Sequence, residues 1–187
     1  STPVTTFAGG TDWKQVSSGN QHTAAIKTDG TLWTWGSAYN GRLGNFASFG
    51  FRSTPVTTFA GGINWKQVSA GGAHTVAIKT DGTLWTWGTG IGGRLGNAIT
   101  SNTSVISPVT TFAGGTDWRQ VSAGYDYTAA IKTDGTLWTW GRNQVYGSIQ
   151  GKLGTNDTTD RSTPVTTFAG GTNWKQVSAS RGHTAAV

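Results

Sequence analysis

The amino-acid sequence predicts an all-β protein, a β-propeller built from four-stranded blades, and three observations lead to this fold class. One phrase, Trp-(Lys/Arg)-Gln-Val-Ser, begins at Trp13, Trp65, Trp118 and Trp174, so a single unit recurs every 52 to 56 residues. Glycine (29 residues) and tryptophan (10 residues) are abundant and charged residues make up only 12%, which indicates tight turns around an aromatic core. Each unit also divides into four short β-type runs separated by Gly, Asp-Gly or Pro.

The repeat boundaries divide the chain into units of approximately 1–52, 53–106, 107–161 and 162–187, of which the last is incomplete. We interpret residues 1–187 as one propeller repeat region and expect it to be a fragment of a larger propeller. Because a blade cut between strands leaves unpaired edges, we also expect the ends to pair with further repeats or with another chain.

The runs of the first unit show how a blade is predicted to fold. Lys-Thr-Asp-Gly-Thr separates the second run from the third, and Asp-Gly predicts a type I′ hairpin in which both turn residues take positive φ. In the third run, Trp33 and Trp35 share one face while Leu32 and Thr34 share the other, so both faces carry bulk. Such a sheet must lie between two neighbours, as a propeller blade does. The four runs are residues 13–17, 22–27, 31–36 and 55–59.

The order of the motifs resembles a known family. The motifs Ala-Gly-x-x-His-Thr, Asp-Gly, Trp-Gly and Gly-x-Leu-Gly recur in order and in register over essentially the whole chain, with single substitutions between copies. This pattern is similar to the repeat of the regulator of chromosome condensation family. The resemblance implies a propeller, usually of seven blades, that binds macromolecules, and near-identical tandem copies are like those of bacterial or phage surface proteins.

Several kinds of chemistry are excluded or disfavoured. The chain has no cysteine, which excludes a disulfide framework, a thiolate zinc site and a catalytic cysteine. No run of about 18 apolar residues exists that could span a bilayer as a helix. His22, His74 and His183 open the second run in three copies, and we interpret a residue repeated once per blade as a structural hydrogen-bonding group, not a metal ligand.

The acidic residues do not indicate catalysis. Asp29, Asp81 and Asp134 belong to the repeated turn, and turn formation accounts for them. The acids outside the repeated pattern are Asp126, Asp157 and Asp160, and no two of them form the carboxyl pair that glycoside hydrolysis needs. We therefore predict a protein that is not an enzyme and that holds no cofactor or metal.

The copies differ in two segments, the turn between the first and second strands and the loop between the third and fourth. In an antiparallel meander both segments emerge at the same sheet edge, so their variation is predicted to gather on one side of the propeller, which we call the variable face. The segments of the variable face are residues 20–21, 72–73, 125–127 and 181–182, and 37–52, 89–106 and 142–161.

The composition of these loops favours binding. All four tyrosines lie there, and seven basic residues stand against three acidic ones in a chain of net charge +6. Rigid aromatic loops on a β scaffold are typical of binding surfaces, although drift of weakly constrained surface loops remains an alternative explanation. The predicted binding residues are Asn20, Gln21, Tyr39, Arg42, Phe46, Phe49, Phe51, Arg94, Tyr125, Asp126, Tyr127, Arg142, Tyr146, Lys152 and Arg181.

Three functional hypotheses follow. The first is a non-enzymatic binding or adhesion scaffold at the surface of a cell or virion, such as part of a phage or bacterial surface structure, that recognises a surface protein or an anionic glycan. The second, implied by the family resemblance, is a regulatory propeller that binds a GTPase, an enzyme or chromatin. The third is a purely structural or decoration protein. Nucleic acid is disfavoured as a partner, because half of the 14 basic residues are spread evenly through the repeat and form no dense stripe.

Overall fold

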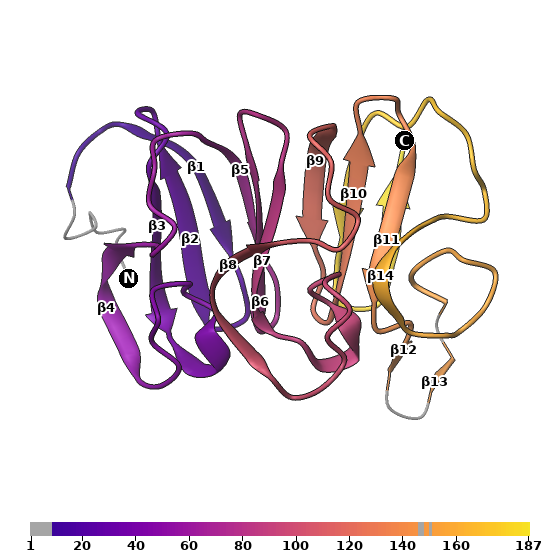
Figure 1. Cartoon of the computed structure of the whole chain (residues 1–187), viewed down its shortest axis with the longest axis horizontal. Helices are drawn as coiled ribbons and strands as arrows, with labels where there is room; N and C mark the ends of the chain where they lie inside the picture. The colour runs from indigo at the N-terminus through magenta and orange to yellow at the C-terminus, as the bar shows by residue number, and fades with distance from the viewer. Residues whose placement is uncertain (1–8, 146–147, 150) are drawn as a thin grey trace, which may run out of the picture.

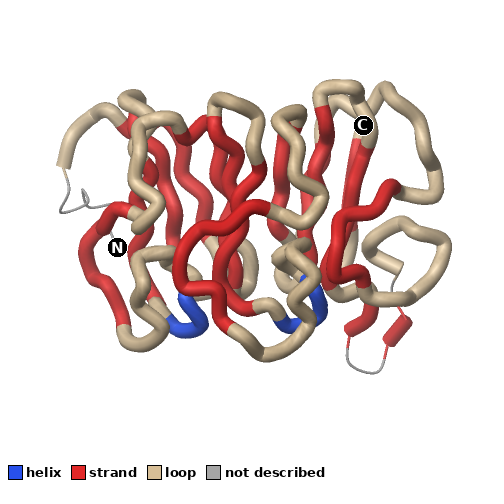
Figure 2. Tube along the Cα trace, viewed as in Figure 1, coloured by secondary structure: helices blue, strands red, loops and turns tan. Residues whose placement is uncertain are grey.

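The computed structural model describes residues 9–145, 148–149 and 151–187, and nearly all of its regular structure is β-strand (Figure 1, Figure 2). Three sheets have four strands each and are the complete blades, and a two-stranded sheet begins a fourth blade. Blade 1 holds β1 (Trp13–Ser18), β2 (His22–Lys27), β3 (Leu32–Ser37) and β4 (Phe51–Thr57); blade 2 holds β5 (Trp65–Ala70), β6 (His74–Lys79), β7 (Leu84–Thr89) and β8 (Ser104–Thr110). Blade 3 holds β9 (Trp118–Ala123), β10 (Tyr127–Lys132), β11 (Leu137–Gly141) and β14 (Arg161–Thr166); blade 4 holds β15 (Val177–Ala179) and β16 (Thr184–Ala186).

The remaining elements lie in the loops between the third and fourth strands. Blades 1 and 2 each carry one short 3-10 turn there, and blade 3 carries a small hairpin. None of the helical turns in the described part of the chain is long enough to cross a membrane. These elements are η1 (Tyr39–Gly41), η2 (Ile91–Gly93), β12 (Gln144–Val145) and β13 (Ser148–Ile149).

Each complete blade is an antiparallel meander whose strands lie in sequence order, which confirms the predicted four-stranded unit. The fourth strand begins earlier than predicted, because Phe51 and Arg52 pair with Ser37 and Gly36 before Pro55 is reached. Pro55 is tolerated there since β4 is the outer edge strand of its sheet, where its missing N–H breaks no ladder bond.

The hairpin between the second and third strands forms as predicted, but its turn type differs. Only Gly30 takes positive φ (81°), while the N–H of Gly30 donates to Lys27 O at 3.0 Å. The result is a three-residue loop that ends in a left-handed glycine, not a type I′ turn. Asp29 keeps negative φ and closes the loop with its side chain, whose Oδ1 accepts from Thr31 N at 2.9 Å and from Thr31 Oγ1 at 2.7 Å.

The hydrophobic core lies between the blades, which stand side by side in Figure 1. Ile26 and Leu32 of blade 1 pack with Trp65, Val68 and Trp87 of blade 2, and all five are at most 2% exposed. Blades 2 and 3 pack in the same way, and so do blades 3 and 4. The prediction that both faces of a blade are buried is therefore confirmed, with the leucine face of one blade against the tryptophan face of the next.

Side chains of the innermost strands also lock each blade to the next. Gln15 Nε2 donates to Val68 O at 3.0 Å, and Val68 N donates back to Gln15 Oε1 at 3.0 Å. Gln67 makes the same pair of bonds with Val121, and Gln120 makes it with Val177. The amide of one glutamine thus pairs with the backbone of the neighbouring blade, as a residue of an adjacent strand would, and it fixes the register between the two blades.

Candidate functional site

The structure brings the two variable segments together at one end of the blades, as the meander predicts. In each complete blade, the residue that begins the long loop donates its N–H to the turn between the first and second strands. The three bonds are Ser37 N to Gln21 O at 2.8 Å, Thr89 N to Ala73 O at 3.0 Å and Arg142 N to Asp126 O at 3.0 Å. The variable face is therefore a real surface of the molecule, at the lower side of Figure 1.

The four turns on this face are joined across the blades by backbone hydrogen bonds. Asn20 N donates to Gly71 O at 3.2 Å, Gly72 N to Tyr125 O at 3.0 Å, and Tyr125 N to Ser180 O at 3.1 Å. A Cβ on Gly72 would lie 2.3 Å from Tyr125 O, so glycine is required at that point. The turns surround a shallow depression of about 190 Å³.

Tyr125 is the most prominent side chain at this depression. Its ring is 42% exposed, and the guanidinium carbon of Arg181 lies 5.3 Å from the ring centroid, within range of a cation–π interaction. Asn20 and Gln21 are exposed in the neighbouring turn, as predicted for binding residues. Arg142 is half-buried and packs over Gly92 of η2.

A second exposed group comes from the long loop of blade 1. The Tyr39 ring lies 6.0 Å from that of Phe49 and 5.8 Å from that of Phe51, both nearly edge-to-face. Phe49 and Phe51 are 75% and 68% exposed, although Phe51 belongs to β4 and not to the loop. Phe46 is also exposed, and its ring contacts that of Phe59 at a tilt, with ring centroids 3.9 Å apart. The N–H of Phe59 donates to Gly44 O at 2.8 Å.

Three predicted ligand-contacting cations are buried instead. Arg42, Arg94 and Lys152 occupy the same position of three repeats, directly before Leu-Gly, and are 5%, 6% and 3% exposed. Arg42 Nε donates to Tyr39 O and Arg94 Nε to Ile91 O, each at 2.8 Å, so both close their own 3-10 turn. Burial lowers the pKa of both guanidinium groups, and the nearby Asp126 carboxylate opposes that effect at Arg94.

Asp126 and Tyr127 are buried too, which corrects their assignment to the binding surface. Asp126 forms an ion pair with Lys152, whose ammonium also lies 5.2 Å from the Tyr127 ring centroid. Tyr127 begins strand β10, donates its hydroxyl to His183 O at 2.5 Å and accepts from Thr184 Oγ1 at 3.0 Å. Burial raises the pKa of the Tyr127 hydroxyl. Tyr146, the remaining predicted binding residue, lies outside the described residues.

Tyr127 stands where the other three repeats have histidine, and two of these histidines, His22 and His74, join neighbouring blades. His22 Nε2 bonds Thr75 Oγ1 at 2.8 Å, and His74 Nε2 bonds Thr128 Oγ1 at 3.0 Å, each joining one blade to the next. The described residues contain no group of three potential metal-ligating side chains. The hydrogen bonds of His22 and His74 to the next blade confirm the interpretation of these two histidines as structural hydrogen-bonding groups.

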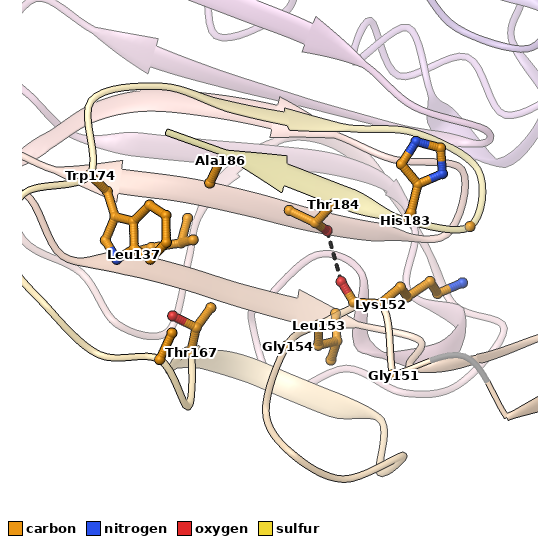
Figure 3. A pocket seen from close by; sticks show the side chains of 12 residues that line it. Leu137, Gly151, Lys152, Leu153, Gly154, Thr167, Trp174, His183, Thr184 and Ala186 are labelled. Carbon is orange, nitrogen blue, oxygen red and sulfur yellow. Dashed lines mark hydrogen bonds between the residues drawn. The ribbon is translucent and has the colours of Figure 1, made fainter.

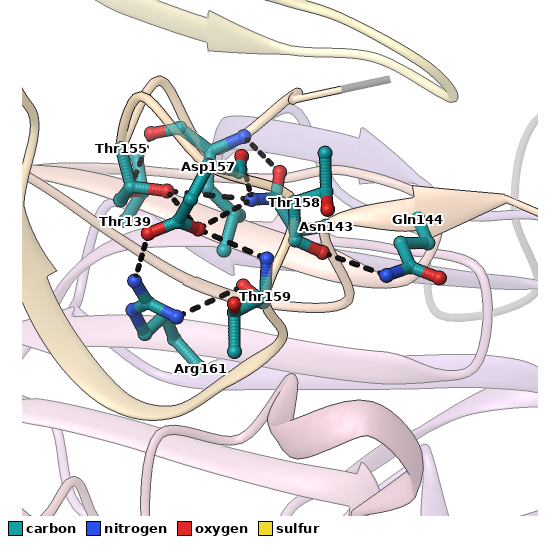
Figure 4. A network of polar contacts seen from close by, with 9 residues as sticks. Thr139, Asn143, Gln144, Thr155, Asp157, Thr158, Thr159 and Arg161 are labelled. Carbon is teal, nitrogen blue, oxygen red and sulfur yellow. Dashed lines mark hydrogen bonds and ion pairs between the residues drawn. The ribbon is translucent and has the colours of Figure 1, made fainter. Parts of the chain in front are cut away.

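The acids of the blade 3 loop hold that loop together (Figure 4). Asp157 Oδ1 accepts from Thr159 N at 2.9 Å, and its other oxygen pairs with Arg161. Asn143, fully buried and missed by the sequence analysis, donates to Asp157 O at 2.8 Å and accepts from Leu153 N at 3.0 Å. Asp160 Oδ1 accepts from Asn143 N at 2.7 Å. The carboxylates of Asp157 and Asp160 therefore both have structural partners within the loop.

Comparison with known proteins agrees with this geometry. The regulator of chromosome condensation (RCC1) repeat matches residues 29–78, 81–131 and 134–187, and a second form of the same repeat matches residues 13–42 and 118–147. The chain belongs to this family. Among its relatives, the ultraviolet-B receptor UVR8 of Arabidopsis thaliana is 34% identical over 179 residues, 93% of this chain and 38% of that protein. The human E3 ubiquitin-protein ligase HERC2 is 32% identical over 138 residues, 72% of this chain and 3% of that protein.

Solved structures show the same fold for this RCC1-like chain. Human WBSCR16 superimposes with a TM-score of 0.78 at 22% identity, covering 94% of this chain and 44% of that one. Prp20p of Saccharomyces cerevisiae gives a TM-score of 0.79 at 18% identity, covering 94% and 43%. The chain thus spans less than half of each of these proteins, and names such as ligase describe whole proteins of which the repeats are one part.

Proposed function

We propose that this RCC1-like propeller segment is a protein-binding module that uses its variable face to bind an acidic patch on a partner protein. The comparisons support a regulatory propeller better than a phage or bacterial adhesin that binds a glycan. The Prp20p structure was described together with that protein's binding to Gsp1p and histones, and another yeast structure holds Kap60 bound to RCC1. Protein partners are therefore the class that these relatives suggest.

The observation that carries the proposal is the charge around Tyr125. Arg181 lies over its ring. Arg42 and Arg142 are close enough to Arg94 that their positive charges lower its pKa. Buried cations beneath a surface raise the potential above it, which attracts acidic groups and speeds their association. A basic partner such as a histone tail would be repelled by this face, so an acidic protein surface is the better match.

Exposed aromatic side chains on the same face supply the apolar part of an interface. Tyr39, Phe49 and Phe51 form one cluster in blade 1, and Tyr125 stands at the centre of the turns. Tryptophan, tyrosine and arginine are enriched among the few residues that dominate binding energy at protein interfaces, and aromatic rings bury large areas with few torsions to immobilise. The variable face therefore combines aromatic anchors with a positive field.

The proposal can be tested with a fluorescent ten-residue peptide rich in glutamate, titrated against the protein by fluorescence anisotropy. Replacing the half-buried Arg142 and the exposed Arg181 together, Arg142→Ala with Arg181→Ala, should weaken binding at least about tenfold, which corresponds to about 1.4 kcal/mol. The matched control, Lys14→Ala with Lys66→Ala, removes two exposed charges from outside the variable face and should change affinity by less than about twofold. Equal losses in the two double variants would show non-specific charge attraction and would refute the assignment of the face.

A further inference from the structure

The first strand of each blade carries one basic residue, and the fold brings these residues to the inner edge of the blades. Along the sequence they are spread evenly, one per repeat, and form no stripe. In the structure the first strands β1, β5, β9 and β15 are neighbours in that order, so one basic side chain follows another along a shared edge. We call these residues the cation arc. They are Lys14, Lys66, Arg119 and Lys175.

A β-bulge presents the basic side chain in each complete blade. The register of β5 against β6 shifts around Lys66, which is left as the extra residue of the strand. The first strands of blades 1 and 3 shift in the same way around Lys14 and Arg119. Bulges re-aim a side chain and are over-represented beside functional sites. The repeat thus builds the same irregularity in each blade at the position of its basic residue.

The contacts of Arg119 show where these side chains extend. Its Nη2 donates to Trp174 O at 2.6 Å and to Lys175 O at 3.3 Å. The side chain therefore crosses from β9 to the next blade and ends beside the backbone of the next cation. Lys14, Lys66 and Lys175 occupy the same position of their repeats and are exposed. Neighbouring members of the cation arc are thus within the reach of one long side chain.

Among the described residues, no acid forms an ion pair with the cation arc. The acids next to it in the sequence already have partners, because Asp12 pairs with Lys27 at 3.4 Å and Asp117 pairs with Lys132 at 3.2 Å. The second and fourth repeats have asparagine in place of this aspartate. Four unmatched positive charges along one edge create a positive potential that attracts a multivalent anion.

We propose that the cation arc binds an inorganic polyphosphate chain. One cation per blade at a constant repeat position matches a polymer that carries negative charge on every unit. Lysine binds phosphate as a point charge, and the guanidinium of arginine matches phosphate geometry. Because the lysines have no fixed partners, they can each meet whichever phosphate lies nearest along the chain.

The surroundings of the cation arc favour a phosphate chain without bases. Proteins that bind single-stranded nucleic acid stack the bases on exposed aromatic rings. The tryptophans that precede the arc residues in blades 2 and 3, Trp65 and Trp118, are 1% exposed. Trp174, which precedes Lys175, lines the cavity between blades 3 and 4 (Figure 3). These rings lie between blades, where bases cannot stack on them.

The cation arc is separate from the variable face. Its residues lie at the start of the first strands, whereas the turns of the variable face follow the ends of those strands. From Lys66 to Gly72 the chain runs along β5 for about 15–20 Å, at the rise of an extended strand. The variable face also combines charge with exposed aromatic rings, while the arc offers charge alone. The two surfaces therefore suit different anions.

The test is isothermal titration calorimetry of the whole protein with inorganic polyphosphate and with orthophosphate, at equal ionic strength. We expect saturable binding of polyphosphate at least about tenfold tighter than that of orthophosphate, because one chain engages several cations at once. It should not displace the glutamate-rich peptide from the variable face, since the two surfaces lie apart. Absence of saturable binding, displacement of that peptide, or tighter binding of a single-stranded oligothymidylate of equal charge would overturn the proposal.

A pair of charge reversals locates the site. Lys66→Glu should weaken polyphosphate binding about tenfold, because an attraction of ordinary surface strength becomes a repulsion. The matched control is Arg52→Glu, which makes the same change in net charge at an exposed residue of the outer strand β4 and should alter affinity by less than about twofold. Both positions are exposed, so both variants should fold. Equal losses in the two variants would mean that polyphosphate responds to net charge alone, and the assignment of the arc would be wrong.

Discussion

The protein should lose stability between pH 7 and pH 5, because His22 and His74 are buried as neutral bases. Burial and the nearby Arg42 charge lower the pKa of His22 from 6.5 to about 3, and burial with the charges of Arg94 and His22 lowers that of His74 well below 6.5. The Nδ1 atoms of both rings are buried without a hydrogen-bond partner among the described residues. A proton added to either ring would therefore create an unpaired buried charge.

The sign and size of the effect follow from proton linkage. Below pH 6.5 the unfolded chain takes up protons at these histidines and the folded protein does not, so the free energy of unfolding falls as the pH falls. With a folded pKa of about 3, His22 alone removes about 2 kcal/mol between pH 7 and pH 5. His74 adds a loss of the same sign. Carboxyl groups with lowered pKa, such as Asp29, lose their contribution only below 3.8 and leave this window undisturbed.

Urea denaturation followed by tryptophan fluorescence at the two pH values, at constant ionic strength, measures this loss. His22→Gln should reduce the difference between pH 7 and pH 5 by about 2 kcal/mol, whatever it does to stability at pH 7. An exposed histidine, His183, is present in both proteins and cancels in the comparison. An unchanged pH difference in His22→Gln would refute the reasoning, since it would mean that His22 titrates alike in the folded and unfolded states.

Three further outcomes are expected from the same denaturation assay. Gly96→Ala should cost about 3 kcal/mol because its Cβ would lie 2.6 Å from the Trp140 indole nitrogen, whereas Gly50→Ala, with positive φ but nothing within 4 Å, should cost about 1 kcal/mol; equal losses would contradict the close packing of Gly96 against Trp140. Lys152→Met should cost about 3–5 kcal/mol by leaving Asp126 buried and unpaired, and changing Asp126 to Leu as well should restore part of it. Gln67→Leu should cost about 1–3 kcal/mol by breaking both hydrogen bonds to Val121 of the next blade, and an unchanged free energy of unfolding would show that Gln67 does not hold the two blades in register.

The strands and their order could be predicted because their causes are local. Asp-Gly marks the hairpin, and the alternation of Leu32, Trp33, Thr34 and Trp35 fixes which side chains share a face. The position of the variable face followed from the meander alone. The predicted type I′ turn was wrong because the carboxylate of Asp29 closes a three-residue loop, and the Asp-Gly sequence alone does not specify this contact.

The binding residues were harder to predict because burial depends on neighbouring blades. Charged side chains are almost always exposed unless paired, and the sequence gives no sign that Lys152 meets Asp126 from another segment of its blade. Arg42 and Arg94 are buried because the carbonyl groups of their own 3-10 turns accept their Nε protons. Their recurrence directly before Leu-Gly was the available signal, since a residue repeated in every blade belongs to the scaffold.

The glutamine contacts between blades have an evolutionary consequence. Each interface joins the same glutamine side chain to the backbone of the same valine, so inserting or deleting one whole repeat of the gene would leave these glutamine contacts chemically unaltered. Unequal recombination between the near-identical copies could therefore change the number of blades without any compensating substitution. Geometry would then limit the outcome, because head-to-tail units close into a ring only when their rotation per unit allows it.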